Sequence, residues 1–254
     1  MRTLWGQVVN AWAWTETVLV VILGTPVVGL VWLCTAPFDP GRYAAGRAFR
    51  LVGVTAMRLN GRWRFRVRGA LADPRRPYVV IANHESYADV FLLSVFPWEM
   101  KWLSKDTMFK IPCMGWMMQM AGDIRLVRGD RDSTLNALAQ CRDRLAKRVS
   151  VMIFPEGTRS RDGRLLPFKD GAFRLAIESG APLLPIAIAG TRNAMAKGTF
   201  RFLRANAMAE VLEPIETAGM TLADIPRLKS LAKDRLEAGR RALAAELGIA
   251  PAAE

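Results

Sequence analysis

His84 is the only histidine in this chain of 254 residues, and it follows a short apolar run at residues 78–82. Such a run is typical of a buried strand, and α/β proteins place working side chains where a strand turns into a helix. Imidazole, with an ordinary pKa of about 6.5, suits general-base chemistry at neutral pH. An alkyl hydroxyl needs such a base before it can attack a thioester.

A base of this kind needs a partner that fixes its tautomer, and Asp89 lies five residues after His84. A carboxylate that accepts the other ring N–H would hold the imidazole in place. The spacing alone is weak evidence, because the chain holds 23 acidic residues and one falls at any given offset about one time in eleven. A structural histidine that caps a helix, with Ser86 or Asn83 bracing the turn, fits this segment equally well.

A second block, SVMIFPEGTRS at residues 150–160, also places polar side chains after an apolar run. Gly157 would let the backbone approach a ligand closely, and Arg159 offers a planar fork of donors that suits phosphate. Thr158 adds a hydroxyl donor, and Glu156 is expected to hold Arg159 or to bind a ligand hydroxyl. A polar turn with a surface ion pair is the alternative for this block taken alone.

Together the two blocks resemble the motifs of the glycerolipid acyltransferase family, in particular its lysophosphatidic acid acyltransferase subgroup. Residues 79–189 carry the resemblance, and no single block of it is as specific as the combination. Further matching blocks occur in the same order: Lys105 with Pro112 and Gly115, the segment GDIRLVR at residues 122–128, Phe168-Lys169-x-Gly171, and LPIAI at residues 184–188.

The resemblance implies direct acyl transfer, with His84 and Asp89 as the catalytic pair. The donor would be acyl-CoA or an acyl carrier protein, used as a co-substrate, and no separate cofactor is expected. The acceptor would be the sn-2 hydroxyl of 1-acyl-glycerol-3-phosphate, so the product would be phosphatidic acid for phospholipid biosynthesis. The family's phosphate-binding residues match these positions: Glu156, Gly157, Thr158, Arg159, Lys105 and Arg128.

One position departs from the family pattern and keeps other functions open. The second motif usually carries Asp or Asn before its arginine, whereas this chain has Val127 before Arg128. An acyltransferase for another lysolipid, such as a lyso-ornithine lipid or lysophosphatidylglycerol, is therefore the first alternative. A hydrolase with the same pair lacks a Gly-x-Ser-x-Gly elbow. A non-catalytic protein that binds anionic lipid would leave the motif blocks without a purpose.

The N-terminal region reads as a membrane attachment. Residues 18–34 hold one weakly polar side chain, Thr25, and would form a helix of about 25 Å, short of a hydrocarbon core of roughly 30 Å. Gly24 and Pro26 are expected to bend this helix. A basic amphipathic helix follows, so residues 1–62 are expected to form a helical hairpin embedded in one leaflet.

A single tilted span, a signal peptide and a buried pair of core helices are the alternatives to this hairpin. Positive charge stays on the cytoplasmic side of a membrane, so the rest of the protein is expected at the cytoplasmic face of the cell membrane. The arginines that support this orientation follow the apolar segment: Arg42, Arg47, Arg50, Arg58, Arg62, Arg64 and Arg66.

Strands and helices alternate in residues 63–254, which predicts one α/β acyltransferase domain with a mixed, largely parallel sheet flanked by helices. The expected strands are residues 63–68, 78–82, 100–103, 124–127, 151–154 and 183–189, the last interrupted by Pro185, with an antiparallel pair at 200–203 and 207–212. The expected helices are residues 90–96, 112–120, a helix capped by Ser133 that runs to about Val149, 171–178 and 224–247, and the alanine-rich tail beyond is expected to be frayed.

The net charge of +13 favours partners that carry phosphate, including an anionic membrane surface and an acidic acyl donor. No zinc-finger, RNA-recognition or leucine-zipper pattern occurs, so nucleic acid is not an expected partner. A single histidine and three scattered cysteines give no spacing for a metal site.

Overall fold

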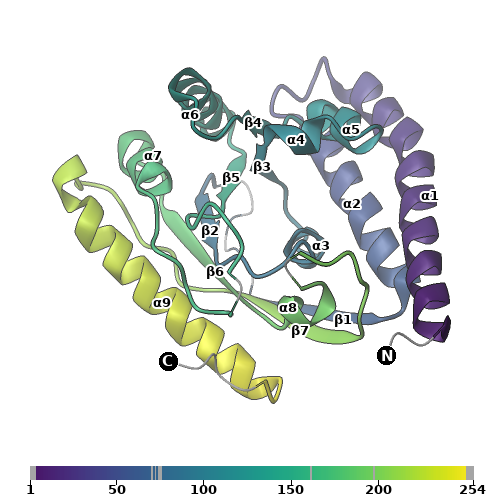
Figure 1. The fold of residues 1–254 in the computed structure, drawn as a ribbon. Helices are drawn as coiled ribbons and strands as arrows, with labels where there is room; N and C mark the ends of the chain where they lie inside the picture. The colour runs from purple at the N-terminus through teal and green to yellow at the C-terminus, as the bar shows by residue number, and fades with distance from the viewer. Residues whose placement is uncertain are drawn as a thin grey trace.

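One seven-stranded sheet forms the centre of the computed structural model, which describes residues 4–69, 71, 73, 76–160, 162–196 and 198–249 (Figure 1). The strand order is β1-β7-β6-β2-β5-β3-β4. All neighbouring pairs run parallel except β6 and β7, which confirms the mixed, largely parallel sheet. The strands are β1 (Trp63–Arg68), β2 (Val79–Ala82), β3 (Met100–Lys105), β4 (Ile124–Leu126), β5 (Ser150–Ile153), β6 (Leu183–Ala189) and β7 (Ala205–Val211).

Helices cover both faces of this sheet, which explains why every residue of β2, β5 and β6 is buried. Val79 and Ile81 point to the face covered by α6 (Arg131–Ala146), α7 (Gly171–Ser179) and α9 (Ile225–Glu246). Val80 and Ala82 point to the other face, which packs against α3 (Asp89–Ser94). The short elements are α4 (Asp106–Phe109), α5 (Met114–Ala121), α8 (Thr191–Ala194) and the 3₁₀ turn η1 (Leu222–Asp224).

The N-terminal region forms a hairpin of α1 (Leu4–Thr35) and α2 (Tyr43–Asn60), with α2 between α1 and the sheet (Figure 1). The first helix is longer than expected, because it begins at Leu4 and continues through Pro26. Its 32 residues span about 48 Å at 1.5 Å per residue. Among the described helices it is the one long and apolar enough to cross a membrane.

Three details of the sequence prediction need correction. The segment 200–203 is irregular, and two of its backbone groups bond side chains of α1 instead of a neighbouring strand. Trp14 Nε1 donates to the Phe200 carbonyl at 2.8 Å, and Phe202 N donates to Asn10 Oδ1 at 2.9 Å. The antiparallel partner of β7 is β6 instead. Pro185 does not interrupt β6.

The cap of α6 also differs, and the tail falls outside the description. Asp130 caps this helix in place of Ser133, since its Oδ1 accepts the Ser133 N–H at 3.0 Å. The predicted fraying of the alanine-rich tail concerns mainly residues 250–254, which lie outside the described residues.

The hairpin packs closely on the sheet at Gly46 of α2. A Cβ atom at this position would lie 2.2 Å from Glu99 Oε1, and Glu99 is itself paired with Lys101 at 3.1 Å in the interior. Gly53 lies two turns further along the same helix, where a Cβ atom would meet Ser94 Oγ at 3.8 Å, an ordinary contact.

These two glycines give a matched test of the packing of α2. Gly46→Ala should lower the free energy of unfolding by about 1–3 kcal/mol, because it overpacks a buried ion pair. Gly53→Ala should leave it unchanged or raise it by up to about 1 kcal/mol, because alanine favours the helix. Thermal unfolding of the full-length protein in detergent would measure both, and equal melting temperatures for the two variants would contradict this packing.

Candidate functional site

The predicted site residues all follow strands whose carboxyl ends meet at one edge of the sheet. His84 comes after β2, Glu156 after β5 and Arg128 after β4, while Lys105 is the last residue of β3. Because these four strands are parallel, residues far apart in the sequence reach the same edge. The described structure therefore brings both motif blocks to one place.

His84 and Asp89 are in direct contact, with His84 Nδ1 2.6 Å from Asp89 Oδ2. Asp89 is the first residue of α3 and is fully buried, and its Oδ2 also accepts the backbone N–H groups of Glu85 at 2.8 Å and Ser86 at 3.0 Å. Because Oδ2 is the acceptor of two backbone N–H groups, it acts as an acceptor toward the ring as well, which places the proton of His84 on Nδ1. Nε2 is then the ring nitrogen that can accept a proton.

The plane of the His84 ring is set by Phe154, which follows β5. The two rings stack with their centroids 3.9 Å apart and their planes 16° apart. The side chain of His84 keeps 15% of its exposure, while that of Asp89 has none. One edge of the imidazole is thus held by a carboxylate and one face by an aromatic ring, while part of the side chain stays exposed.

Glu156 joins the two motif blocks through their backbones. Its Oε1 accepts the His84 N–H at 2.8 Å, and its Oε2 accepts the Leu166 N–H at 2.9 Å. The loop is closed further by Ser160 N, which donates to the His84 carbonyl at 2.8 Å. Burial raises the pKa of Glu156 to about 7, against the opposing effect of the two N–H donors. Glu156 therefore organises the turn through the main chain, and a role in holding Arg159 or in binding a ligand hydroxyl stays a prediction.

Arg159 lies on the same side of the site as His84, stacked on an aromatic ring from the first motif block. Its guanidinium carbon is 3.7 Å from the centroid of the Tyr87 ring. Gly157 adopts a φ of +66°, a left-handed conformation that glycine adopts without strain. Thr158, between them, is exposed. The turn therefore places a planar cation and an exposed hydroxyl residue next to the loop of the candidate base.

Lys105 and Arg128 are further from His84 than the other predicted site residues. Both are exposed, and they sit on or after β3 and β4, which are two and three positions from β2 in the sheet. At the usual strand separation these positions are roughly 10 and 14 Å from β2. The two cations add positive charge along this edge of the sheet, at the ends of β3 and β4, whereas Arg159 lies beside the His84 loop itself. Val127, the departure from the family pattern, is 40% exposed near this edge.

The structure adds three residues that the sequence analysis did not place in the site. Lys169 lies against Gly157, where a Cβ atom would be 3.0 Å from Lys169 Nζ, and its block had been noted only as part of the resemblance. Tyr87 supports Arg159, and no sequence signal indicated that contact. Burial, and then the nearby Asp89, raise the pKa of Glu85 to about 8, so a second carboxyl group beside the candidate pair holds its proton near neutral pH.

A cavity of about 460 Å³ opens at the opposite edge of the sheet. It is lined by Arg76, Arg142, Pro182 and residues near the end of α7, and it contains none of the predicted site residues. Within the described ranges, no group of three or more His, Cys, Asp or Glu side chains is arranged to hold a metal ion.

Comparison with known proteins finds acyltransferases that are similar in sequence to this chain. A 1-acyl-sn-glycerol-3-phosphate acyltransferase of Chlamydomonas reinhardtii is 42% identical over 137 residues, and the match covers 54% of this chain and 41% of that protein. The human 1-acyl-sn-glycerol-3-phosphate acyltransferase alpha is 36% identical over 170 residues, covering 65% of this chain and 59% of its own. The chain thus spans about two fifths to three fifths of the length of these two relatives.

The fold has a solved counterpart. The crystal structure of the 1-acyl-sn-glycerophosphate acyltransferase PlsC from Thermotoga maritima matches with a TM-score of 0.81 at 24% identity, over 96% of this chain and 98% of that one. The model of the Acyltransferase family matches residues 64–189, the segment that runs from β1 to the end of β6 and holds both motif blocks. This chain belongs to the acyltransferase family.

Proposed function

We propose that this protein is a 1-acylglycerol-3-phosphate O-acyltransferase. It would transfer a fatty acyl group from acyl-CoA or acyl carrier protein to the sn-2 hydroxyl of 1-acyl-glycerol-3-phosphate and form phosphatidic acid. The observation that carries the proposal is the contact of 2.6 Å between His84 Nδ1 and the buried carboxylate of Asp89, beside a turn that presents Arg159. The names of the relatives support the same substrate class.

The geometry supports a direct transfer in which His84 Nε2 takes the proton of the lysolipid hydroxyl. The oxygen attacks the thioester carbonyl carbon, and the C–S bond then breaks as the tetrahedral intermediate collapses. The thiolate leaves with the proton that the imidazolium returns, so the base is regenerated. Asp89 stays hydrogen-bonded to Nδ1 and stabilises the imidazolium. No acyl-enzyme intermediate is required, because base and acceptor act in one complex with the donor.

The acceptor phosphate is proposed to bind at the turn after β5. Arg159 would supply paired donors, while Thr158 and the backbone at Gly157 would complete the contact. Lys169 lies against this turn and adds a second cation. Lys105 and Arg128 stand further along the edge, where they would attract the acidic donor or stabilise developing oxyanion charge.

We further propose that residues 1–62 anchor the protein at the cytoplasmic face of the cell membrane and that residues 63–254 form the acyltransferase domain. The large apolar side chains of α1 are mostly exposed, in a stripe that recurs at helical spacing, as lipid contact requires. They are Leu4, Trp5, Val8, Trp12, Val18, Leu19, Ile22, Leu23, Val27, Leu30 and Leu33. A helix of about 48 Å exceeds a hydrocarbon core of roughly 30 Å, so it would lie tilted or partly outside the core.

A different lysolipid acceptor is the second candidate, and Val127 is the observation that favours it. An apolar side chain stands where the family places a polar one, at the positive edge of the site. A lyso-ornithine lipid or lysophosphatidylglycerol would carry a larger head group than a phosphate. A non-catalytic protein that binds anionic lipid would need no histidine held by a buried carboxylate.

Acyl transfer with a panel of lysolipids tests the function directly. Purified full-length protein in vesicles, given labelled acyl-CoA or acyl carrier protein, should acylate 1-acyl-glycerol-3-phosphate faster than the other lysolipids. His84→Ala should lower the rate at least about 100-fold, because a positioned base contributes this much. Substantial activity of His84→Ala with unchanged folding would reject His84 as the base, and label released only as free fatty acid would indicate a hydrolase.

Arg159→Lys tests the proposed phosphate contact in the same assay. Lysine keeps the charge but loses the planar fork, so the KM for the lysolipid should rise about 10-fold while kcat changes little. The KM for the acyl donor should stay the same. A fall in kcat alone would reassign Arg159 to stabilisation of the transition state.

Alkaline carbonate extraction of membranes tests the anchor. The full-length protein should stay with the membrane pellet, because α1 and α2 present apolar surface that is worth about 25 cal/mol for each Å² buried in lipid. Removal of residues 1–42 should weaken retention. Release of the full-length protein into the soluble fraction would contradict an integral attachment.

A further inference from the structure

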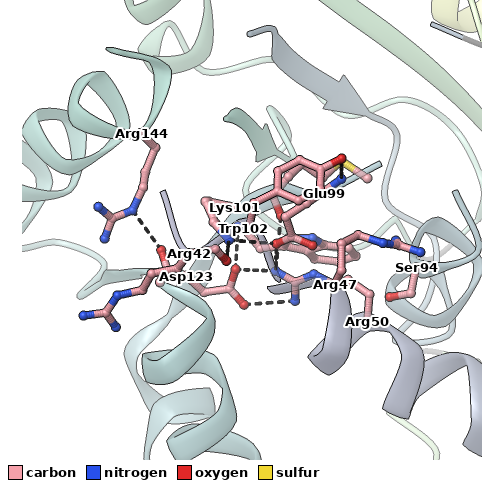
Figure 2. Close-up of polar contacts among 12 residues, drawn as sticks. Arg42, Arg47, Arg50, Ser94, Glu99, Lys101, Trp102, Asp123 and Arg144 are labelled. Carbon is pink, nitrogen blue, oxygen red and sulfur yellow. Dashed lines mark hydrogen bonds and ion pairs between the residues drawn. The ribbon is translucent and has the colours of Figure 1, made fainter. Parts of the chain in front are cut away.

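A cluster of buried charges lies where α2 packs on β3, away from the carboxyl edge (Figure 2). Its members are Arg50 of α2, Glu99 before β3, Lys101 on β3 and Asp123 before β4, and each is less than a tenth exposed. Two positive and two negative side chains balance each other in this cluster. It joins the N-terminal hairpin to the amino ends of two strands of the sheet.

Arg50 is the centre of the cluster (Figure 2). Its Nη1 donates to Asp123 Oδ2 at 3.0 Å, and its Nη2 bonds Asp123 Oδ1, Glu99 Oε1 at 3.3 Å and the Met100 carbonyl at 3.2 Å. Lys101 Nζ completes the network through Glu99 at 3.1 Å. Asp123 Oδ1 also accepts the backbone N–H of Trp102 at 2.9 Å. These bonds fix the plane of the Arg50 guanidinium and its position relative to β3.

Burial of such a cluster is not explained by stability alone. Removing charges from water is costly, and well-packed hydrophobic residues of the same volume are often as stable or more so. What an ion network adds is a unique geometry, because the planar fork of Arg50 can meet its acceptors in one orientation only.

A continuous series of ring contacts leads from Arg50 to His84. The guanidinium carbon of Arg50 lies 5.0 Å from the centroid of the Trp102 ring. Trp102 meets Phe154 edge to face, with centroids 6.4 Å apart and planes at 72°. Phe154 stacks on His84 at 3.9 Å. Each contact fixes the angle of the next ring, so the plane of the imidazole depends on the position of Trp102.

We propose that Arg50 is a positioning residue for His84: held by Asp123 and Glu99, it fixes Trp102, which through Phe154 sets the plane of the imidazole. The inference rests on the proposed function, since it assigns a purpose to that plane in acyl transfer. It also makes the geometry of the reaction centre depend on how the hairpin helix α2 packs on the sheet. Asp89 fixes one edge of the ring, and this network fixes its face.

The test compares conservative variants of the full-length protein in vesicles. Arg50→Lys keeps the charge but loses the fork and the flat contact with Trp102. It should lower kcat roughly 10- to 100-fold, as small misplacements of a reacting group do, with the KM values for both substrates nearly unchanged. Arg241→Lys is the matched control, because Arg241 pairs with Glu237 on the exposed side of α9 and should leave kcat unchanged.

A double-mutant cycle separates positioning from simple support of the fold. Phe154→Leu breaks the same series near His84 without touching the charged cluster, and it should also lower kcat. If both residues act through one series, the double variant should lose little more than the worse single variant. Losses that multiply, together with melting temperatures that fall in proportion to activity, would overturn the inference in favour of a structural role.

The single histidine provides a readout that does not depend on activity. The protein is labelled at histidine and purified without a histidine tag, and the NMR signals of the His84 ring are recorded. Their chemical shifts should change in Arg50→Lys and in Phe154→Leu but not in Arg241→Lys, because these shifts depend on how the Phe154 ring stacks on the imidazole. An unshifted His84 signal in folded Arg50→Lys would overturn the positioning role. If the wild type transferred no acyl group while the shift occurred, the proposed function would fail and the positioning link would stand.

Discussion

The candidate site depends on one buried oxygen. Asp89 Oδ2 accepts the Nδ1–H of His84 together with the backbone N–H groups of Glu85 and Ser86. A carboxylate at this position therefore does two things at once: it folds the chain after β2 into a tight turn at the start of α3, and it selects the tautomer of the histidine. The geometry of the candidate pair and the local fold cannot be varied independently.

The sheet supplies the second constraint. Parallel strands place their carboxyl ends at one edge, so the turn after β5 must lie beside the turn after β2. Glu156 lies between these turns and accepts the backbone N–H of His84 and that of Leu166. The turn after β5 and the loop of the candidate base are thus connected through main-chain hydrogen bonds. The side chain of Arg159 stacks on Tyr87 of the same loop.

Buried ionisable side chains gather at the carboxyl edge and between α2 and β3, for different reasons. At the carboxyl edge, Glu85 and Glu156 are carboxyl groups whose pKa values burial raises, to about 8 and about 7, which limits repulsion with Asp89 near neutral pH. Between α2 and β3, the buried acids are instead balanced by Arg50 and Lys101. The first arrangement shapes the electrostatics around the proposed base, and the second fixes how a helix of the hairpin sits on the sheet.

The sequence by itself determined the local elements and the residue types of the site. Apolar runs and alternation located β1 and β6 to the residue, because strand burial leaves a local signal. His84, Asp89 and Arg159 were singled out by the combination of two motif blocks and the family they resemble, since the spacing of each block alone is weak evidence. Only the tertiary structure decided that Phe154 covers the imidazole, that Glu156 binds backbone, and that segment 200–203 packs on α1 through Trp14. These contacts join residues from 70 to 186 positions apart, and local patterns in the sequence carry no signal for contacts at such separations.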